Sequence, residues 1–257
     1  MPRARKRFGQ HFLHDQNVIE SILHAIDPQP GETIVEIGPG RGALTYPLLQ
    51  RCKTLIAIEL DRDLVPLLEK QASAFGNLEI INEDILEFDL LTIPHEAGLR
   101  LVGNLPYNIS TPLMFHLLES ANAIRDMHFM VQKEVASRIV ASPGDSNYGR
   151  LSVMLQYQCD CQHLLDVAPG CFKPPPKVNS ALIRLLPLSH PRHDVGDYAT
   201  FSGIVQSAFG QRRKTISNSL KMTLDRETII ACGIDPGLRA ENLALSDFAK
   251  LSRACTP

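Results

Sequence analysis

The sequence contains no tryptophan, and tyrosine and phenylalanine bring the aromatic share of its 257 residues to only 6%. No apolar run approaches the about 20 residues that a membrane-spanning helix needs, and no hydrophobic segment follows the charged start. We therefore expect neither a membrane helix nor a secretory signal. The six cysteines are too scattered for a disulfide framework, which favours a reducing compartment and a cytoplasmic protein.

The composition that is present is ordinary for a globular protein, with 44% hydrophobic and 21% charged residues, and it excludes disordered, collagen-like and coiled-coil classes. The formal net charge of −2 argues weakly against a nucleic-acid binder, which usually carries a basic surplus. Two local clusters of basic residues favour a nucleic-acid binder instead. Four cations lie among the first seven residues, and three more are at Arg212-Arg213-Lys214. Such clusters are most often solvated faces, so neither decides the function alone.

Short apolar runs alternate with amphipathic stretches between residues 31 and 131. The runs are rich in isoleucine, valine and leucine, as buried parallel strands are. They cover residues 33–37, 55–59, 78–81, 99–102 and 127–131, and the intervening helical patterns cover 44–51, 64–74 and 112–121. Because parallel strands need crossover connections, this order predicts a doubly wound α/β sheet.

The second half of the chain changes character. A helix is expected over 151–158, and the apolar runs 163–167 and 181–186 could form an antiparallel edge pair on the sheet. Residues 188–197 have the composition of a linker, and helical patterns alone follow, at 198–209, 215–222, 226–232 and 246–255. We expect one sheet domain over 1–187 and a small all-helical domain over 198–257.

A glycine-rich turn, Gly38-Pro39-Gly40-Arg41-Gly42-Ala43, follows the first strand of the predicted sheet. Glycines allow a sharp turn and let a ligand approach a helix N-terminus closely. Glu36 precedes the turn, and Glu59 ends the next strand, where a carboxylate can accept both ribose hydroxyls of NAD or of S-adenosylmethionine. Asp84 could bond an adenine amino group, or it could instead cap a helix.

The end of the fourth strand distinguishes the two cofactors. Asn104-Leu105-Pro106-Tyr107 lies at the carboxyl edge of the sheet, where open α/β folds place their chemistry. Pro106 favours an extended Leu105, so that the Leu105 carbonyl and the Asn104 amide oxygen can face one pocket. Two acceptors beside an aromatic ring suit a planar amine, although a simple proline turn is the alternative.

These motifs together resemble the adenine-N6 methyltransferases that act on ribosomal RNA, and most of all the bacterial small-subunit rRNA adenine N6,N6-dimethyltransferases. The resemblance covers nearly the whole chain. Its segments are residues 5–13, 36–42, 104–112, 132–134, 148–152, 172–178, 211–216 and 239–242. The erythromycin-resistance methylases share the glycine turn and a similar Pro-Tyr motif but lack the helical-domain segments. The resemblance implies a Rossmann-like methyltransferase sheet, mostly parallel, with a helical C-terminal domain.

The resemblance also implies roles for single residues. S-adenosylmethionine would be held by His11, Leu13, Gly38, Gly40, Glu59, Asp84, Ile85 and Asn104. His11 stands where some members of the family carry asparagine, so we expect it to act through its backbone. The reacting base would meet Asn104, Leu105, Pro106 and Tyr107, with Phe172 on its opposite face unless Phe172 is a core residue. The expected RNA contacts are Arg5, Lys6, Arg7, Arg150, Arg212, Arg213 and Lys214.

The implied reaction is the double methylation of two adjacent adenosines in a hairpin loop near the 3′ end of 16S rRNA. For this reaction we expect a monomer that acts during small-subunit assembly and that needs neither a metal ion nor a membrane. Two other functions stay open: a binding module that uses the same fold to hold RNA or a polymerase, and a nicotinamide oxidoreductase, which Pro39 disfavours. Cys159-x-Cys161-x-His163 has short spacing and no obvious fourth ligand, so we expect packing cysteines rather than a zinc site.

Overall fold

The structure is a computed structural model that describes residues 11–211 and 213–255. The chain forms two compact units, one of Met1–Ala136 with Cys161–Pro187, and one of Ser137–Asp160 with Leu188–Pro257. The border at Pro187 lies where the sequence analysis ends the sheet domain, whereas residues 137–160 belong to the second unit together with the C-terminal helices. The expected functional division into domains stays a prediction.

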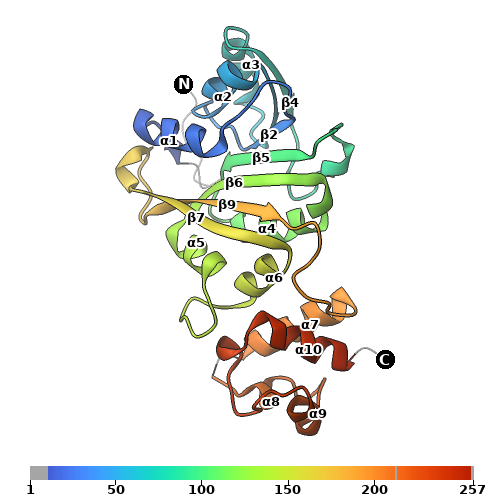
Figure 1. Cartoon of the computed structure of the whole chain (residues 1–257). Coiled ribbons are helices and arrows are strands. Elements are labelled where there is room, and N and C mark those ends of the chain that lie inside the picture. The colour runs from blue at the N-terminus through green and yellow to red at the C-terminus, as the bar shows by residue number, and fades with distance from the viewer. Residues whose placement is uncertain (1–10, 212, 256–257) are drawn as a thin grey trace. The chain divides into compact units, whose positions relative to one another are not determined.

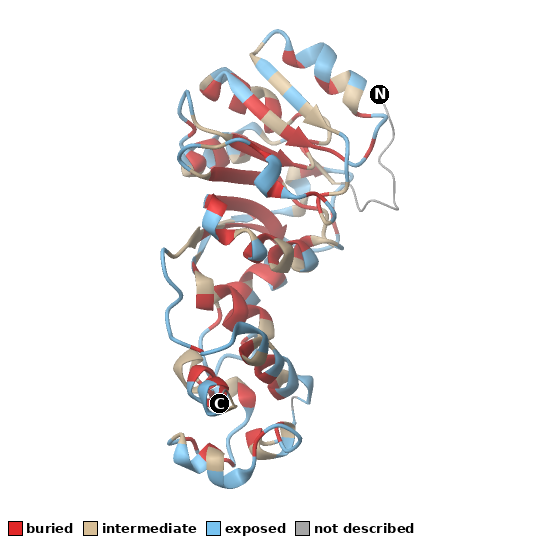
Figure 2. Ribbon diagram, turned by 90° about the vertical axis from the view of Figure 1, so that its right-hand side faces the viewer, coloured by how far each residue is buried: buried red, intermediate tan, exposed pale blue. Residues whose placement is uncertain are grey.

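A seven-stranded sheet forms the centre of the first unit, in the order β4-β3-β2-β5-β6-β9-β7 (Figure 1). The first five strands in this order, from β4 through β2 to β6, run parallel to one another, and β9 pairs antiparallel with β6. The central strands consist mostly of hydrophobic residues, and most of these residues are buried (Figure 2). The strands are β2 (Ile34–Ile37), β3 (Thr54–Ile58), β4 (Asn77–Ile81), β5 (Leu99–Asn104), β6 (Ile124–Gln132), β7 (Cys159–Val167) and β9 (Ser180–Pro187).

The strand order creates a switch point beside β2. The chain steps outward from β2 to β3 and β4 and then returns to β5 on the other side of β2. Ligands of open α/β sheets bind outside the carboxyl ends of the strands at such a point. The helices on this part of the chain are α1 (Gln16–Ile26), α2 (Thr45–Cys52), α3 (Val65–Ala72), α4 (Ser110–Glu119) and α5 (Lys133–Val140).

Helix α1 was not expected from the sequence analysis. Asp15 caps its N-terminus by accepting from the backbone N–H groups of residues 17 and 18. Its buried face, Ile19, Ile22, Leu23 and Ile26, has helical spacing and packs in the core with residues of α2 and of the central strands. The chain just before α1 forms β1 (Phe12–Leu13), which pairs antiparallel with β8 (Phe172–Lys173). Helix α1 therefore anchors the segment that carries His11.

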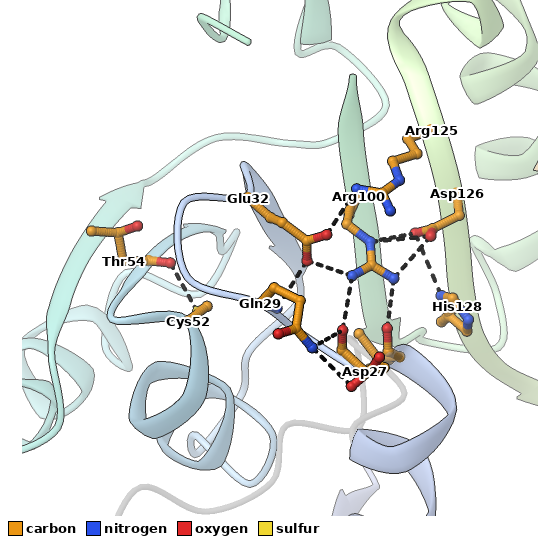
Figure 3. A network of polar contacts seen from close by, with 10 residues as sticks. Asp27, Gln29, Glu32, Cys52, Thr54, Arg100, Arg125, Asp126 and His128 are labelled. Atoms are coloured by element: carbon orange, nitrogen blue, oxygen red, sulfur yellow. Dashed lines mark hydrogen bonds and ion pairs between the residues drawn. The ribbon is translucent and has the colours of Figure 1, made fainter. Parts of the chain in front are cut away.

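Arg100 fixes the C-terminal end of α1 to the sheet (Figure 3). Its guanidinium makes a forked contact with Asp126, with Nη2 2.9 Å from Oδ2, and donates to the Ile26 carbonyl at 2.6 Å. Nη1 lies 2.6 Å from Glu32 Oε2, and Arg125 holds the other oxygen of Glu32 at 2.8 Å. Because Arg100 is second in β5, this buried network lies at the end of the sheet opposite the carboxyl ends of the parallel strands.

The second unit is helical. Its helices are α6 (Arg150–Gln158), α7 (Tyr198–Gly210), α8 (Ile216–Ser219), α9 (Arg226–Ala231) and α10 (Leu245–Cys255). Aromatic side chains join them, with ring centroids 4.7 Å apart between Tyr157 and Phe201 and 5.6 Å apart between Phe209 and Phe248. No helix among residues 11–211 and 213–255 combines the length and the hydropathy needed to cross a bilayer.

The expected fold class is confirmed. Every strand and helix expected from the sequence overlaps an observed element, and the sheet is mostly parallel with an antiparallel strand next to its β7 edge. The helix expected over 215–222 is shorter in the structure. Only Ile216–Ser219 is helical, and turns follow it. Helix α5 and the two-stranded β1–β8 sheet, like α1, were missed.

Candidate active site

A pocket opens at the carboxyl ends of β2, β3 and β5, at the switch point of the sheet. It is lined by segments within residues 11–13, 36–44, 58–60, 83–85 and 104–109, and we call it the glycine-turn pocket. The eight residues expected to hold the cofactor all line it, as do Leu105, Pro106 and Tyr107. The structure therefore brings together in one place two sequence motifs that are about sixty residues apart.

The glycine turn bends sharply at the end of β2. Gly38 and Gly40 have φ angles of +68° and +59°, in the left-handed region that residues with a Cβ atom rarely adopt. A Cβ atom on Gly40 would also lie 3.2 Å from the ring of Phe12, which in turn carries the Arg41 guanidinium 4.2 Å from its centroid. The N-terminal segment thus packs directly on the turn, and a side chain at Gly40 would meet both an unfavourable φ angle and a close contact with the Phe12 ring.

Glu59 joins the turn to the next strand. Its Oε2 accepts from the Gly40 N–H at 3.0 Å and its Oε1 accepts from the Asp61 N–H at 2.8 Å. Burial raises the pKa of the Glu59 carboxyl, and these backbone hydrogen bonds act in the opposite direction. A carboxylate has about four acceptor positions, so two remain for the hydroxyls of a ribose. The two backbone hydrogen bonds fix the orientation of this side chain in the pocket.

Glu36 lies beneath the turn and is a titrating group that the sequence analysis noted but gave no role. Its side chain is 2% exposed, lines the pocket, and has no hydrogen-bond partner for Oε2 among the described residues. Burial, together with the charge of Glu59, raises the pKa of Glu36 to about 8. The pocket therefore presents a carboxyl group that is mostly protonated at neutral pH and that a cationic ligand would ionise.

The Asn104–Tyr107 loop closes the other side of the pocket. Asn104 is the last residue of β5, and its Nδ2 donates to the His11 carbonyl at 2.9 Å. This bond uses the donor side of the amide and leaves Oδ1 to accept from a ligand. The Leu105 N–H donates to the Met130 carbonyl at 3.1 Å, which ties the loop to the neighbouring strand.

Tyr107 is held at both its ring and its hydroxyl. Its hydroxyl lies 2.7 Å from Ser180 Oγ, at the start of β9. Its ring stacks with the imidazole of His11, with centroids 5.6 Å apart and an interplanar angle of 29°. The His11 Nδ1 lies 2.8 Å from the Pro174 carbonyl, so this side chain is also fixed. Sequence reasoning missed Ser180 and the stacking role of His11, since both depend on contacts distant along the chain.

Asp84 and Ile85 line the pocket beside Glu59. The Asp84 Oδ1 accepts from the Leu86 N–H at 3.0 Å, in a local turn rather than at the start of a helix. This bond occupies one oxygen and leaves the other for a ligand. Ile85 is buried and offers an apolar wall.

Phe172 does not line the glycine-turn pocket. Its side chain is 2% exposed and belongs to the hydrophobic core beside Leu13, its partner in the β1–β8 pair. A ring in that position cannot stack on a base without leaving the core. This position favours the alternative that Phe172 is a core residue, and its role as a second stacking platform stays a prediction.

The expected RNA contacts fall into two groups. Arg5, Lys6, Arg7 and Arg212 lie outside the described residues. In the second unit, Arg150 begins α6, and Arg213 and Lys214 are exposed in the turn after α7. Their role in RNA binding stays a prediction.

The short cysteine motif does not form a ligand set. Cys159 is fully buried, which raises the pKa of its thiol to about 12, and His163 Nε2 lies 2.9 Å from Asp166 Oδ1. Within the described parts of the chain, no group of three or more histidine, cysteine, aspartate or glutamate side chains is placed to hold a metal ion. The position of Cys159 supports a role in packing.

Comparisons with known proteins agree with this geometry. The family described as "Ribosomal RNA adenine dimethylase" matches residues 1–256. The Ribosomal RNA small subunit methyltransferase A of Methylococcus capsulatus is 54% identical over 253 residues, which are 98% of each chain. The crystal structure of a dimethyladenosine transferase from Plasmodium falciparum superposes with a TM-score of 0.78 at 25% identity, covering 94% of this chain and 96% of the other. For the 23S rRNA methyltransferase ErmE, the TM-score is 0.73 at 26% identity, with 96% and 100% covered. The chain therefore belongs to the ribosomal RNA adenine dimethylase family.

Proposed function

We propose that this protein transfers methyl groups from S-adenosylmethionine to N6 of two adjacent adenosines in a hairpin loop near the 3′ end of 16S rRNA. One observation carries the proposal. A single pocket combines the Glu59 carboxylate and a close-packed glycine turn with the Asn104 amide, whose Oδ1 is left to accept, and the backbone of Leu105. The name of the 54% identical relative, which specifies the small subunit, supports the choice of 16S rRNA.

The residues of the pocket fit S-adenosylmethionine. Glu59 would take the ribose hydroxyls, Asp84 and Ile85 the adenine, and the backbone at Gly38 and Gly40 the methionine portion. The buried, unpartnered Oε2 of Glu36 suits the positive charge of this ligand. When bound, the cofactor supplies an electrophilic methyl group on a positively charged sulfur.

The protein makes the adenine amino group a better nucleophile. The lone pair of N6 is delocalised into the ring, and acceptance of its hydrogens by Asn104 Oδ1 and the Leu105 carbonyl favours a pyramidal nitrogen. The His11 carbonyl holds the Asn104 amide with Nδ2 turned towards it, which directs Oδ1 to the substrate. A bond from this nitrogen to the methyl carbon would form as the carbon–sulfur bond breaks, and the N6 proton would leave to solvent after the transfer. Alignment of the reacting atoms supplies much of the acceleration.

Tyr107 provides the surface for an adenine that has left its stack in the RNA. Extruding a base costs a few kcal/mol, least in a loop, and stacking on an aromatic ring returns about 1–3 kcal/mol. The Tyr107 ring already stacks with a planar group, the His11 imidazole. After one methylation N6 keeps one N–H for an acceptor, and after two it has none, which promotes release of the product.

We further propose that the basic residues expected from the sequence, Arg5, Lys6, Arg7, Arg150, Arg212, Arg213 and Lys214, bind rRNA. In this proposal residues 1–187 carry the methyl transfer, residues 188–197 link, and the helices of residues 198–257 contact RNA. The protein would act as a monomer in the cytoplasm, where small subunits assemble, without a metal ion.

The test is mass spectrometry of nucleosides from small-subunit rRNA. Unmodified subunits from cells that lack the protein are incubated with it and with S-adenosylmethionine carrying a ¹³C methyl group. We expect labelled N6,N6-dimethyladenosine at two adjacent positions. Absence of the label with RNA binding retained would instead support a binding module, and label on another atom or base would reject the proposed reaction.

A further inference from the structure

A second hollow lies on the same edge of the sheet as the glycine-turn pocket. It is lined by residues 132–134, Pro169 and residues 177–179. Residue 132 ends β6, which runs parallel to β5, and residue 179 immediately precedes β9. The hollow therefore opens where the carboxyl end of β6 meets the start of β9, one strand away from Asn104.

The register of the strands places the hollow close to the reacting base. Asn104 pairs with Met130, two residues before Gln132 in β6. Adjacent strands lie about 4.8 Å apart and two residues advance about 6.6 Å, so the Cα atoms of Asn104 and Gln132 are about 8 Å apart. One nucleotide of an extended single strand can bridge such a distance.

The Tyr107–Ser180 hydrogen bond joins the two sites. Ser180 bonds the Tyr107 hydroxyl at 2.7 Å and pairs in register with Gln132. Asn179, which lines the hollow, precedes Ser180, and its carbonyl accepts from the Lys133 N–H at 2.9 Å. The ring on which the target base would stack is thus fixed by Ser180, the residue that directly follows Asn179 in the wall of the hollow.

The chemistry of the hollow suits a nucleoside more than a bare phosphate. Gln132 and Asn179 carry amides, which both donate and accept and can therefore bond base edges. Val178 is 46% exposed and offers an apolar surface that a base or a ribose can cover.

The charges in the hollow nearly cancel. Lys133 forms an ion pair of 2.6 Å with Asp166, and Glu134 is also in the lining, so these residues add little net positive charge. Lys177 is the exposed cation that remains for one phosphate of a nucleotide. A strongly basic groove, which would hold RNA by its backbone alone, is not what these residues form.

We infer that this hollow binds the nucleotide next to the adenosine being methylated, with its base and ribose on Val178 and the two amides and its phosphate on Lys177. The inference rests on the proposed function and adds a second nucleotide position to it. In a pair of adjacent adenosines, the partner that is not reacting would occupy the hollow.

The first test compares Lys177→Glu with Lys70→Glu, an identical charge change on the exposed face of α3. We expect Lys177→Glu to raise the KM for rRNA about tenfold with a much smaller change in kcat, and to lower the slope of log KM against log salt by about one. The Kd for S-adenosylmethionine should stay that of the wild type, which also shows that the variant is folded. Equal KM values for the two variants would overturn the inference.

The second test locates the RNA directly. The photocrosslinking change Val178→p-benzoylphenylalanine, in the full-length protein bound to unmodified small subunits, should crosslink to the nucleotide adjacent to the methylated adenosine. Crosslinks to a distant nucleotide or to a ribosomal protein would overturn the inference. Failure of the wild-type protein to methylate adenine rejects the proposed function instead, so the two failures are distinguishable.

Discussion

Glu36→Gln tests whether the carboxyl beneath the glycine turn is neutral in the protein without its cofactor. Its pKa rises from the ordinary 4.5 to about 8 in the fold, mainly because burial removes it from water. A tenfold change in an acid dissociation constant corresponds to about 1.4 kcal/mol, so ionising Glu36 inside the folded protein costs about 5 kcal/mol relative to the unfolded chain. Glutamine has nearly the same shape as the protonated carboxyl and cannot ionise.

The sign of the pH dependence follows from proton binding. Between pH 4.5 and 8 the unfolded chain has lost the Glu36 proton while the folded protein keeps it, so the stability that this group contributes at low pH is lost as the pH rises. Urea unfolding at pH 5, 6, 7 and 8, without S-adenosylmethionine, measures the effect. We expect the free energy of unfolding of the wild type to fall by roughly 3–4 kcal/mol more than that of Glu36→Gln over this range. Parallel curves would refute the assignment of a neutral Glu36.

Two further predictions concern the turn and the network at the other end of the sheet. Gly40→Ala, at φ +59° with its Cβ 3.2 Å from Phe12, should weaken S-adenosylmethionine binding about tenfold in calorimetric titration. Gly144→Ala, also at a positive φ (+89°) but with nothing within 4 Å, is the control and should leave this Kd unchanged; equal effects would contradict the account. Arg100→Met should lower the free energy of unfolding by about 3–5 kcal/mol because it leaves buried carboxylates without their cationic partner. Arg125→Met, whose side chain is 50% exposed, should cost under about 1 kcal/mol, and similar losses in urea unfolding would show that burial is not the cause.

The sheet and the position of the site could be predicted from local sequence patterns. Runs such as Ile34–Ile37 are apolar and short, and the order of strands and helices allows few topologies. The carboxyl ends of parallel strands meet at one edge, so the glycine turn and Asn104 could be placed together before their contacts were known. Helix α1 could also have been found, because Asp15 is an N-cap residue and the following apolar residues have helical spacing.

Contacts between distant segments could not be predicted in this way. The bond from Asn104 Nδ2 to the His11 carbonyl joins residues 93 positions apart, and no periodicity encodes it. The burial of Phe172 depends on its pairing with Leu13 across the β1–β8 sheet, which two-residue strands do not reveal in a sequence. The packing of residues 137–160 with the C-terminal helices likewise comes from tertiary contacts rather than from a change in composition.

The single-turnover rate of Asn104→Ala tests the central claim most directly. It is measured with unmodified small subunits and S-adenosylmethionine at saturating concentrations, so that weaker binding of either one does not affect the result. Loss of one aligned acceptor at the reacting nitrogen should lower the rate of methyl transfer about 10²–10³-fold, while the RNA still binds. A rate within a few-fold of the wild type would show that the Asn104 oxygen does not activate the adenine amino group.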